Sequence, residues 1–477
     1  MKLWLAFAAL LLILAALATW LGRRSARAMV HSRRLRVDRF KLRKKHTDIR
    51  FEVFSDPEVV EAIRRFAKEK HVSLDSAQRE ARLYLAEIVP KFNLLAYYRF
   101  GAPIARALLN SLYRVAVERR MLRSLSEDVS RDSVVVYIIN HRSNADYLLV
   151  AHMLFKFVSL SYAVGEWARV WPLNHLFKWF GGYFVRRRYR EPLYHAVLRS
   201  FVQTITRNGV IQGVFIEGGL TRDGAFRKPK LGMLDYLITS KGDKNFKGLL
   251  YLVPTAINYD RVLEDRSLIQ ELMGKEDRAS KLEKLQTTLD FLFKNALRSM
   301  LHRFKRYGNA VVSFGEPLLV DELVAADPLL IAPDFETRKE SLQRVADRLM
   351  SEISAALPVT PVPAVAAIFR AHDGLTLSKE EIIAAITKMR EETAARMWIG
   401  RSPEQIWESA RRILDLRHLV EPLSGGWRWV PNETLLRDYY ANSLLTYEEV
   451  RQRGWPESRR EPGSAKVEAP APDSLPR

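Results

Sequence analysis

The sequence predicts an α/β protein whose central layered domain follows a helical region and precedes a small helical domain. Short apolar runs rich in β-branched residues, such as Val134–Ile139 and residues 249–258, alternate with amphipathic helical patterns. This alternation is typical of helices packed on a largely parallel sheet. The 477 residues allow two or three domains, and the 48% hydrophobic and 27% charged content is that of a folded protein.

The N-terminus predicts a membrane anchor. Residues 3–21 are uncharged and apolar, with Trp4 and Trp20 near their ends, and are long enough to cross a bilayer as a helix. A run of arginines and lysines follows, so the positive-inside rule keeps the body of the chain in the cytoplasm. We therefore expect an anchor in residues 1–22 at the inner (cytoplasmic) membrane. A cleaved signal peptide is the alternative, because Ala16-Leu17-Ala18 resembles a cleavage site.

The charge of the chain points to phosphate-bearing partners. Its formal net charge is +21, and the basic juxtamembrane segment 23–50 would hold anionic membrane lipid. Much of the charge is thereby explained, and since no zinc-finger or RNA-binding signature occurs, no nucleic-acid partner is expected. The absence of cysteine excludes disulfides, cysteine–zinc sites and a thiol nucleophile. We predict no metal site.

The remaining chain divides into four further segments. Residues 51–125 are predicted to be helical, with an amphipathic run in 97–124 that covers one face of the sheet. The α/β domain spans 126–357 and ends at the proline- and alanine-rich stretch 357–364. A small winged-helix-like domain with a hairpin bent at Gly425-Gly426 spans 364–450, and a disordered tail spans 456–477. We expect strands at 134–139, 160–164, 183–185, 214–216, 249–258 and 310–314, and C-terminal helices at 378–392 and 403–416.

The first strand leads into a candidate catalytic pair, His141 and Asp146. His141 follows the carboxyl end of the strand, and Asp146 lies in the first turn of the next helix. Ligand crevices of α/β sheets lie at this edge. The turn allows the carboxylate to bond one imidazole nitrogen, so that the other acts as a general base. Alternatively, Ser143-x-x-Asp146 is an ordinary capping box and His141 a loop histidine.

Two later strand ends carry groups suited to a phosphate. Arg186 and Arg187 follow the strand at 183–185, and guanidinium groups bind phosphate through paired hydrogen bonds. The alternative is a solvated or lipid-facing basic patch. After the strand at 214–216, two glycines allow close approach of an anion to backbone N–H groups, although a plain turn is the more common case. The residues singled out in this second stretch are Glu217, Gly218, Thr221, Arg222, Lys228 and Lys230.

Four sequence blocks follow one another along the chain: His141-Arg-Ser-Asn-Ala-Asp146-Tyr147, Gly181-Gly182-Tyr-Phe184-Val-Arg186-Arg187, Phe215-Ile-Glu217-Gly218-Gly219 with Arg222, and Val253-Pro254 through Tyr259 and Glu264. In this order they resemble the glycerol-3-phosphate acyltransferase family, within the glycerolipid acyltransferases that share the His-x4-Asp motif. The resemblance extends from about residue 90 to 447, including Tyr439-Tyr440-Ala-Asn442 near its end.

The resemblance implies a membrane-bound enzyme that moves a fatty acyl group from acyl-CoA or acyl-carrier protein to glycerol 3-phosphate, with no cofactor. It implies that His141 is the base and that Asp146 orients it. Arg186, Arg187 and Arg222 would bind the acceptor phosphate, and Glu217 and Gly218 would shape that side of the site. Pro254 and Tyr147 would be acyl-side or structural elements.

One departure puts the acceptor in question. The family has Arg-Ser-Arg where this chain has Leu220-Thr221-Arg222, and losing one such arginine costs roughly 1.5–3 kcal/mol of charged hydrogen bonding. Dihydroxyacetone phosphate and lysophosphatidic acid are therefore alternative acceptors. A membrane-tethered adaptor that binds lipid or nucleic acid is the alternative of another class, and it has no use for a His/Asp pair.

Overall fold

The computed structural model describes residues 46–89, 106, 109–118, 133–153, 160–164, 182–186, 189, 191–274, 307–400 and 402–455. The predicted anchor and tail, and most of the juxtamembrane segment, lie outside these ranges. Within them, no helix is both long and apolar enough to cross a membrane.

The described residues contain one mixed eight-stranded sheet in the order β1-β7-β6-β2-β5-β3-β4, with β8 also paired to β6, and a separate two-stranded hairpin in the C-terminal region. Strand β2 lies in the middle of the sheet and, in agreement with the predicted parallel arrangement, runs parallel to β5 and β6. In contrast, β7 and β8 run antiparallel to β6. The strands are β1 (Arg114–Val117), β2 (Val134–Ile139), β3 (Leu160–Val164), β4 (Gly182–Phe184), β5 (Ile211–Phe215), β6 (Leu250–Tyr259), β7 (Asn309–Phe314) and β8 (Leu318–Leu319).

Strand β1 corrects the expectation that residues 51–125 are helical throughout. Its sequence, Arg-Val-Ala-Val, pairs in parallel with the start of β7 and extends the sheet by one edge strand. Two β-branched residues suit this pairing. The local sequence pattern is compatible with an amphipathic helix. Pairing with β7, which is distant in sequence, therefore decides that these residues form a strand.

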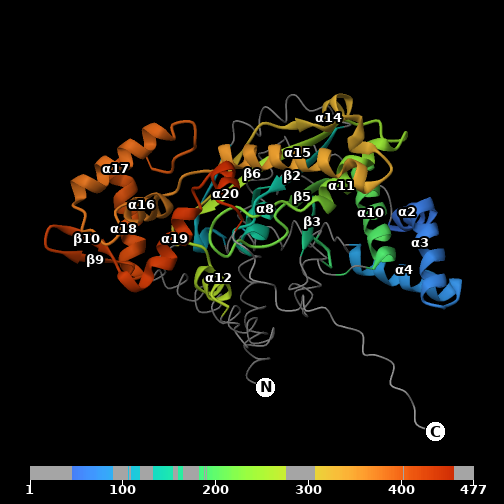
Figure 1. Ribbon diagram of the computed structural model, residues 1–477, viewed down its shortest axis with the longest axis horizontal. Coiled ribbons are helices and arrows are strands. Elements are labelled where there is room, and N and C mark those ends of the chain that lie inside the picture. Colours follow the sequence, from blue (N-terminus) through green and yellow to red (C-terminus); the bar gives the residue numbers. More distant parts are fainter. Residues whose placement is uncertain are drawn as a thin grey trace, which may run out of the picture.

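Helices cover both faces of the sheet (Figure 1). In β2, Val134, Val136 and Ile138 face one core, and Tyr137 and Ile139 face the other. Burial on both faces explains why this strand reads as an unbroken apolar run. The first core includes α2 (His46–Ser55), α3 (Pro57–Glu69), α4 (Leu74–Ile88), α10 (Pro192–Arg207), α11 (Leu231–Thr239) and α15 (Phe335–Ala355); the second includes α8 (Asp146–Met153), α12 (Asp265–Leu272) and the C-terminal helices.

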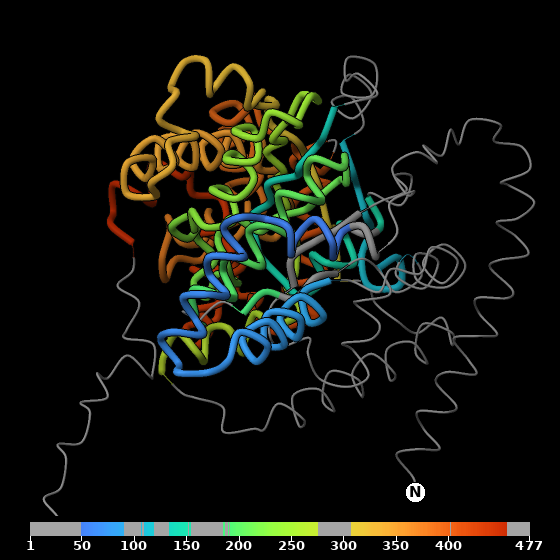
Figure 2. The backbone as a smooth tube through the Cα atoms, turned by 90° about the vertical axis from the view of Figure 1, so that its right-hand side faces the viewer, coloured from blue at the N-terminus to red at the C-terminus, as the bar shows by residue number. Residues whose placement is uncertain are grey.

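The N-terminal helices and the C-terminal region lie at opposite ends of the sheet (Figure 1). Figure 2, viewed from the N-terminal side, shows α3 and α4 in front of the sheet. The C-terminal region has the expected order of helix, helix and hairpin, while its winged-helix character stays a prediction. Its elements are α16 (Pro361–Ala371), α17 (Lys379–Glu392), α18 (Pro403–Leu416), β9 (Val420–Leu423), β10 (Gly426–Trp429), α19 (Thr434–Asn442) and α20 (Tyr447–Gln452). Shorter elements are η3 (Ser240–Gly242), α14 (Val320–Ala326), η4 (Pro328–Ile331) and η5 (Pro431–Glu433).

Asp260, just after β6, joins the two regions. Its carboxylate accepts hydrogen bonds from Asn309 N (2.7 Å) and from Val362 N (3.0 Å) in the first turn of α16. Helix α16 begins at Pro361, inside the stretch 357–364 expected to mark the domain boundary. Proline is tolerated there because it lies in the first turn of the helix. A side chain from the α/β domain thus satisfies an N–H at the start of this helix, and this is one of the buried polar contacts between the two regions.

Candidate active site

The turn between β2 and α8, residues 140–146, is hereafter called the catalytic turn. The first residue of this turn, Asn140, is held by β6. Its side-chain Nδ2 donates to Ile257 O (3.0 Å), and its Oδ1 accepts from Ile257 N (2.7 Å). His141 follows the carboxyl end of β2, and Asp146 is the first residue of α8. Both positions match the prediction from sequence.

The predicted pair is in contact. His141 Nδ1 lies 2.9 Å from Asp146 Oδ2, and the two side chains are 2% and 0% exposed. The same carboxylate oxygen accepts from Arg142 N (2.7 Å) and Ser143 N (3.0 Å), so Asp146 also stabilises the start of the helix, as the capping alternative required. With Nδ1 bonded to the carboxylate, Nε2 is the nitrogen that can accept a proton from a substrate.

Tyr259 at the end of β6 completes a chain of three groups. Its hydroxyl donates to the other oxygen of Asp146, Oδ1, at 2.5 Å. Burial and the charge of Asp146 raise the pKa of Tyr259 well above its ordinary value, so the hydroxyl stays a donor. Tyr259 is not among the site residues predicted from the sequence. It follows Asp146 by more than 100 residues, and only the parallel pairing of β6 with β2 brings the two together.

Tyr259→Phe is expected to move the acid limb of the pH–kcat/KM profile upward by about half a pH unit. Without the hydroxyl, Asp146 concentrates its charge on His141 and stabilises the imidazolium. Tyr113→Phe is the matched control, since that hydroxyl donates to Arg261 O (2.7 Å) and its ring packs 5.3 Å from the Tyr259 ring. An identical shift in both variants would mean that packing, and not the bond to Asp146, moves the limb.

Two aromatic side chains, which also contact each other at 5.1 Å, pack against the imidazole. The ring of Phe215, the last residue of β5, stacks on His141 at 4.1 Å between centroids with a 22° interplanar angle. Tyr147 packs edge-on at 5.4 Å. Together with Asp146, these contacts fix both the tautomer and the plane of the ring. For Tyr147 this is a structural contact, and its predicted acyl-side role stays a prediction.

The loop after β5 holds the backbone of His141. Glu217 accepts from His141 N (3.1 Å) and from Arg227 N (2.9 Å), and Thr221 N donates to His141 O (3.3 Å). Burial raises the pKa of Glu217 to about 7 despite the opposing charge of Arg142. Gly218 has a φ of +67° and its missing Cβ would lie 2.9 Å from Lys230 Cγ, so this position requires glycine.

Arg142 is a buried site residue that sequence reasoning missed. Its guanidinium donates to the carbonyl oxygens of Gly224 and Ser443 (3.3 Å for the latter) and lies 5.1 Å from the Phe226 ring centre. The residue next to the candidate base thereby connects the catalytic turn to the C-terminal region. A surface arginine and a buried one look alike in sequence, so no local signal could have distinguished them.

Glu264 lies on the opposite side of the catalytic turn. It accepts hydrogen bonds from Ser143 Oγ (2.8 Å) and Asn144 N (3.2 Å). Burial, with a further contribution from the charge of Asp146, raises the pKa of Glu264 to about 7. Two buried carboxyl groups, Asp146 and Glu217, and the partly buried Glu264 therefore contact the turn, with Arg142 as a buried cation.

This raised pKa predicts a pH-dependent stability. A carboxyl group that titrates near 4.5 when unfolded and near 7 when folded favours the folded state below pH 4.5 and loses that contribution as the pH rises to 7. The contribution is at most roughly 3 kcal/mol. Glu264→Gln should flatten the fall in unfolding free energy between pH 5 and 8, measured by urea denaturation. Exposed Glu380→Gln is the control, and an unchanged slope in Glu264→Gln would contradict the assignment.

The predicted phosphate-binding residues are differently placed. Arg186 binds both carboxylate oxygens of Glu87 on α4 (2.9 and 2.5 Å) and contacts three tyrosine rings. Arg222 pairs with Glu271 on α12 at 3.1 Å, both being about two-fifths exposed. Lys228 and Lys230 are exposed, and Arg187 lies outside the described residues. Arg222 is therefore near the loop that holds His141, whereas Arg186 is committed to a carboxylate.

Pro254 lies in the middle of β6, paired in register with Ile138 of β2. Its carbonyl accepts from Gly315 N (2.9 Å), in the connection where the outer neighbour of β6 changes from β7 to β8. The N–H and C=O of one strand residue point to the same side of the strand. The backbone N–H that proline lacks would therefore point toward this connection, where no strand residue needs it as a hydrogen-bond donor. The position is consistent with a structural element. Within the described part of the chain, no group of three or more potential ligand side chains could hold a metal ion.

A buried, carboxylate-oriented histidine at the carboxyl end of a central strand defines an α/β protein with a candidate general-base site. Two family models match the chain in succession: Acyltransferase over residues 122–258, and the glycerol-3-phosphate acyltransferase C-terminal region over 292–447. The chain therefore belongs to the glycerol-3-phosphate acyltransferase family.

Individual relatives agree with this placement. Glycerol-3-phosphate acyltransferase from Colwellia psychrerythraea is 28% identical over 348 residues, covering 69% of this chain and 40% of that protein. The protein of the same name from Xylella fastidiosa is 24% identical over 420 residues, covering 82% and 46%. The chain thus spans less than half the length of these relatives.

A solved structure was also compared. The 1-acyl-sn-glycerophosphate (LPA) acyltransferase PlsC from Thermotoga maritima is 15% identical, covering 61% of this chain and 92% of that one, with a TM-score of 0.30. A likeness of this size does not bear on substrate or mechanism.

Proposed function

We propose that this chain transfers a fatty acyl group from acyl-CoA or acyl-carrier protein to the sn-1 hydroxyl of glycerol 3-phosphate, making lysophosphatidic acid for phospholipid synthesis. The observation that carries the proposal is the buried contact of 2.9 Å between His141 Nδ1 and Asp146 Oδ2. Glycerol 3-phosphate as the acceptor is supported by the relatives, which are longer proteins named glycerol-3-phosphate acyltransferase.

The chemistry follows from this pair. His141 Nε2 takes the proton of the acceptor hydroxyl as its oxygen attacks the thioester carbonyl carbon. Asp146 stabilises the imidazolium that forms. As the C–S bond breaks, the proton on His141 passes to the departing sulfur, which regenerates the base. The thioester is already a reactive acyl donor, so no covalent enzyme intermediate is required.

Arg222 is proposed to bind the acceptor phosphate, with Thr221 and Lys228 beside it. At the family arginine position occupied by Leu220, we propose that Arg227 substitutes, because its NH1 donates to Leu220 O at 3.2 Å. Arg222→Gln and Arg227→Gln should each raise the acceptor KM about tenfold with little change in kcat, as expected for a lost charged hydrogen bond. Arg390→Gln, distant on α17, is the control. A fall in kcat at unchanged KM would assign these arginines to another role.

The enzyme is proposed to act on the inner (cytoplasmic) membrane, held by its N-terminal anchor and by anionic lipid bound to the basic segment. Its product carries an acyl chain and would enter the bilayer. This location explains the distribution of positive charge near the N-terminus.

The test measures free thiol released from palmitoyl-CoA by purified full-length protein in lipid vesicles. Glycerol 3-phosphate, dihydroxyacetone phosphate and lysophosphatidic acid are offered separately, and each assay is repeated with acyl-carrier protein as donor. Turnover with glycerol 3-phosphate alone supports the proposal. Turnover only with another acceptor keeps the chemistry and changes the substrate. No turnover with any combination of donor and acceptor would favour the adaptor.

A further inference from the structure

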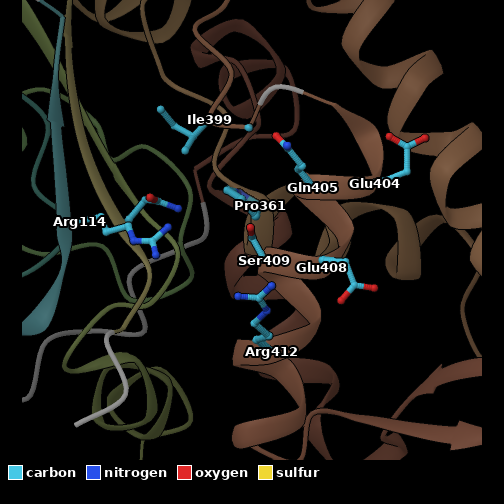
Figure 3. A pocket seen from close by; sticks show the side chains of 10 residues that line it. Arg114, Pro361, Ile399, Glu404, Gln405, Glu408, Ser409 and Arg412 are labelled. Atoms are coloured by element: carbon cyan, nitrogen blue, oxygen red, sulfur yellow. The ribbon is translucent and has the colours of Figure 1, made fainter. Parts of the chain in front are cut away.

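A cleft of about 560 Å³ separates the β1–β7 edge of the sheet from the C-terminal helices (Figure 3). Its volume is within the range of small-molecule sites. Its walls come from both regions: Arg114 and Asn309 from the first residues of β1 and β7, and Pro361, Gln405, Ser409 and Arg412 from α16 and α18.

The cleft opens at the same edge of the sheet as the catalytic turn. Because β7 is antiparallel to β6 and β1 is parallel to β7, the amino ends of β1 and β7 lie beside the carboxyl end of β6, beyond the level at which β2 ends: Ala310 pairs with Tyr259, whereas Ile139 pairs with Thr255. Three strand spacings, about 14 Å in total, separate β1 from β2. A ligand held at Arg114 could therefore extend along this edge toward His141.

Two guanidinium groups face the cleft, and neither has an ion-pair partner among the residues that the structure describes. The side chains of Arg114 and Arg412 extend into the gap from opposite walls (Figure 3). The carboxylates of Glu404 and Glu408 point away from Arg114 in the same view, and Glu408 pairs with Arg411 at 3.0 Å. Two cations across a gap repel each other and are stabilised by an anion between them.

The walls are held in place before any ligand binds. Asp260 accepts hydrogen bonds from Asn309 on one wall and from Val362, adjacent to Pro361, on the other. A gap whose walls share a buried carboxylate needs little reorganisation on binding, which favours affinity.

We propose that this cleft binds the phosphate groups of the CoA part of the acyl donor. The assignment rests on the proposed function, in which the thioester lies at His141. In acyl-CoA the thioester and the phosphates occupy opposite ends of a long pantetheine arm, so the donor requires a phosphate site displaced along the sheet edge from the base. Arginine side chains suit such groups because they bind phosphate oxygens through paired hydrogen bonds.

The test is calorimetric titration of free CoA into full-length protein in vesicles, for wild type, Arg114→Gln, Arg412→Gln and the double variant. We expect the Kd to rise about fivefold in each single variant and at least tenfold in the double variant. Arg411→Gln is the matched control, because it removes the same charge from the same helix but from a side chain already paired with Glu408 and Asp415. Equal weakening by Arg411→Gln, or no weakening in the double variant, overturns the assignment.

Separate arms identify the source of the phosphate and the point of failure. Titration with glycerol 3-phosphate should give the same Kd in wild type and double variant, and a loss confined to this ligand would overturn the assignment to CoA. CoA binding requires no turnover. If the wild type acylates no acceptor but the Kd for CoA depends on both arginines, the cleft assignment holds and the proposed reaction fails; if turnover occurs without that dependence, only the cleft assignment fails.

Discussion

His141→Ala is expected to lower kcat for acyl transfer about 100- to 10,000-fold, which is the usual contribution of a positioned general base. The substitution removes the imidazole ring. Its Nε2 is the proposed proton acceptor, and its Nδ1 lies 2.9 Å from Asp146 Oδ2. KM for the acceptor should change little, because its phosphate is assigned to other residues. Thiol release from palmitoyl-CoA, measured at saturating acceptor, reports the effect.

The control must separate loss of the base from loss of the fold, since His141 is buried in contact with Phe215 and Tyr147. His195→Ala is the matched variant. This histidine is partly buried on α10 and bonds the Tyr189 carbonyl (2.7 Å) and the Tyr236 hydroxyl (3.2 Å) without any carboxylate. Both variants should keep near-wild-type circular dichroism, and only His141→Ala should lose turnover. A similar loss of turnover in both would refute the assignment of the base.

The α/β class and the contact between His141 and Asp146 could be predicted because their signals are local. The strand Val134–Ile139 is a continuous apolar run rich in β-branched residues. Because this strand ends at Ile139, the His-x4-Asp spacing places both side chains on the turn that follows it. The C-terminal helices at Lys379–Glu392 and Pro403–Leu416 also begin and end where their sequence patterns change. In each case, neighbouring residues in the sequence decide the outcome.

The surroundings of the pair could not be predicted, because long-range pairing creates them. Tyr259 reaches Asp146 across 113 positions, and Glu264 reaches Ser143 across 121. The same limit applies to charge. Arg186 has the sequence context of a phosphate ligand, but its Glu87 partner lies 99 residues away on a helix that only the fold brings near. Sequence shows which groups exist, and the sheet order determines which of them meet.

Gly224→Ala is expected to lower the unfolding free energy by more than about 3 kcal/mol. Gly224 has a φ of +85°, and an added Cβ would overlap the backbone carbonyl of Tyr439 on α19. Relief requires α19 to move, and this helix carries Tyr440, whose hydroxyl bonds Asp265, and Asn442, whose amide donates to Asp223 O at 3.0 Å. Because the Gly224 carbonyl also accepts from Arg142, activity should fall together with stability.

Gly374→Ala isolates the conformational part of that effect. Gly374 has a φ of +73°, similar to that of Gly224, but no atom lies within 4 Å of the added Cβ. Its substitution should cost only about 1 kcal/mol, the strain of the left-handed backbone, and leave kcat unchanged. Urea denaturation of both variants at pH 7 measures the difference. Equal losses would mean that backbone strain alone matters and that close packing of α19 on this loop does not stabilise the active site; a larger loss in Gly224→Ala, accompanied by reduced turnover, would mean that the C-terminal region supports the catalytic turn through the backbone of Gly224.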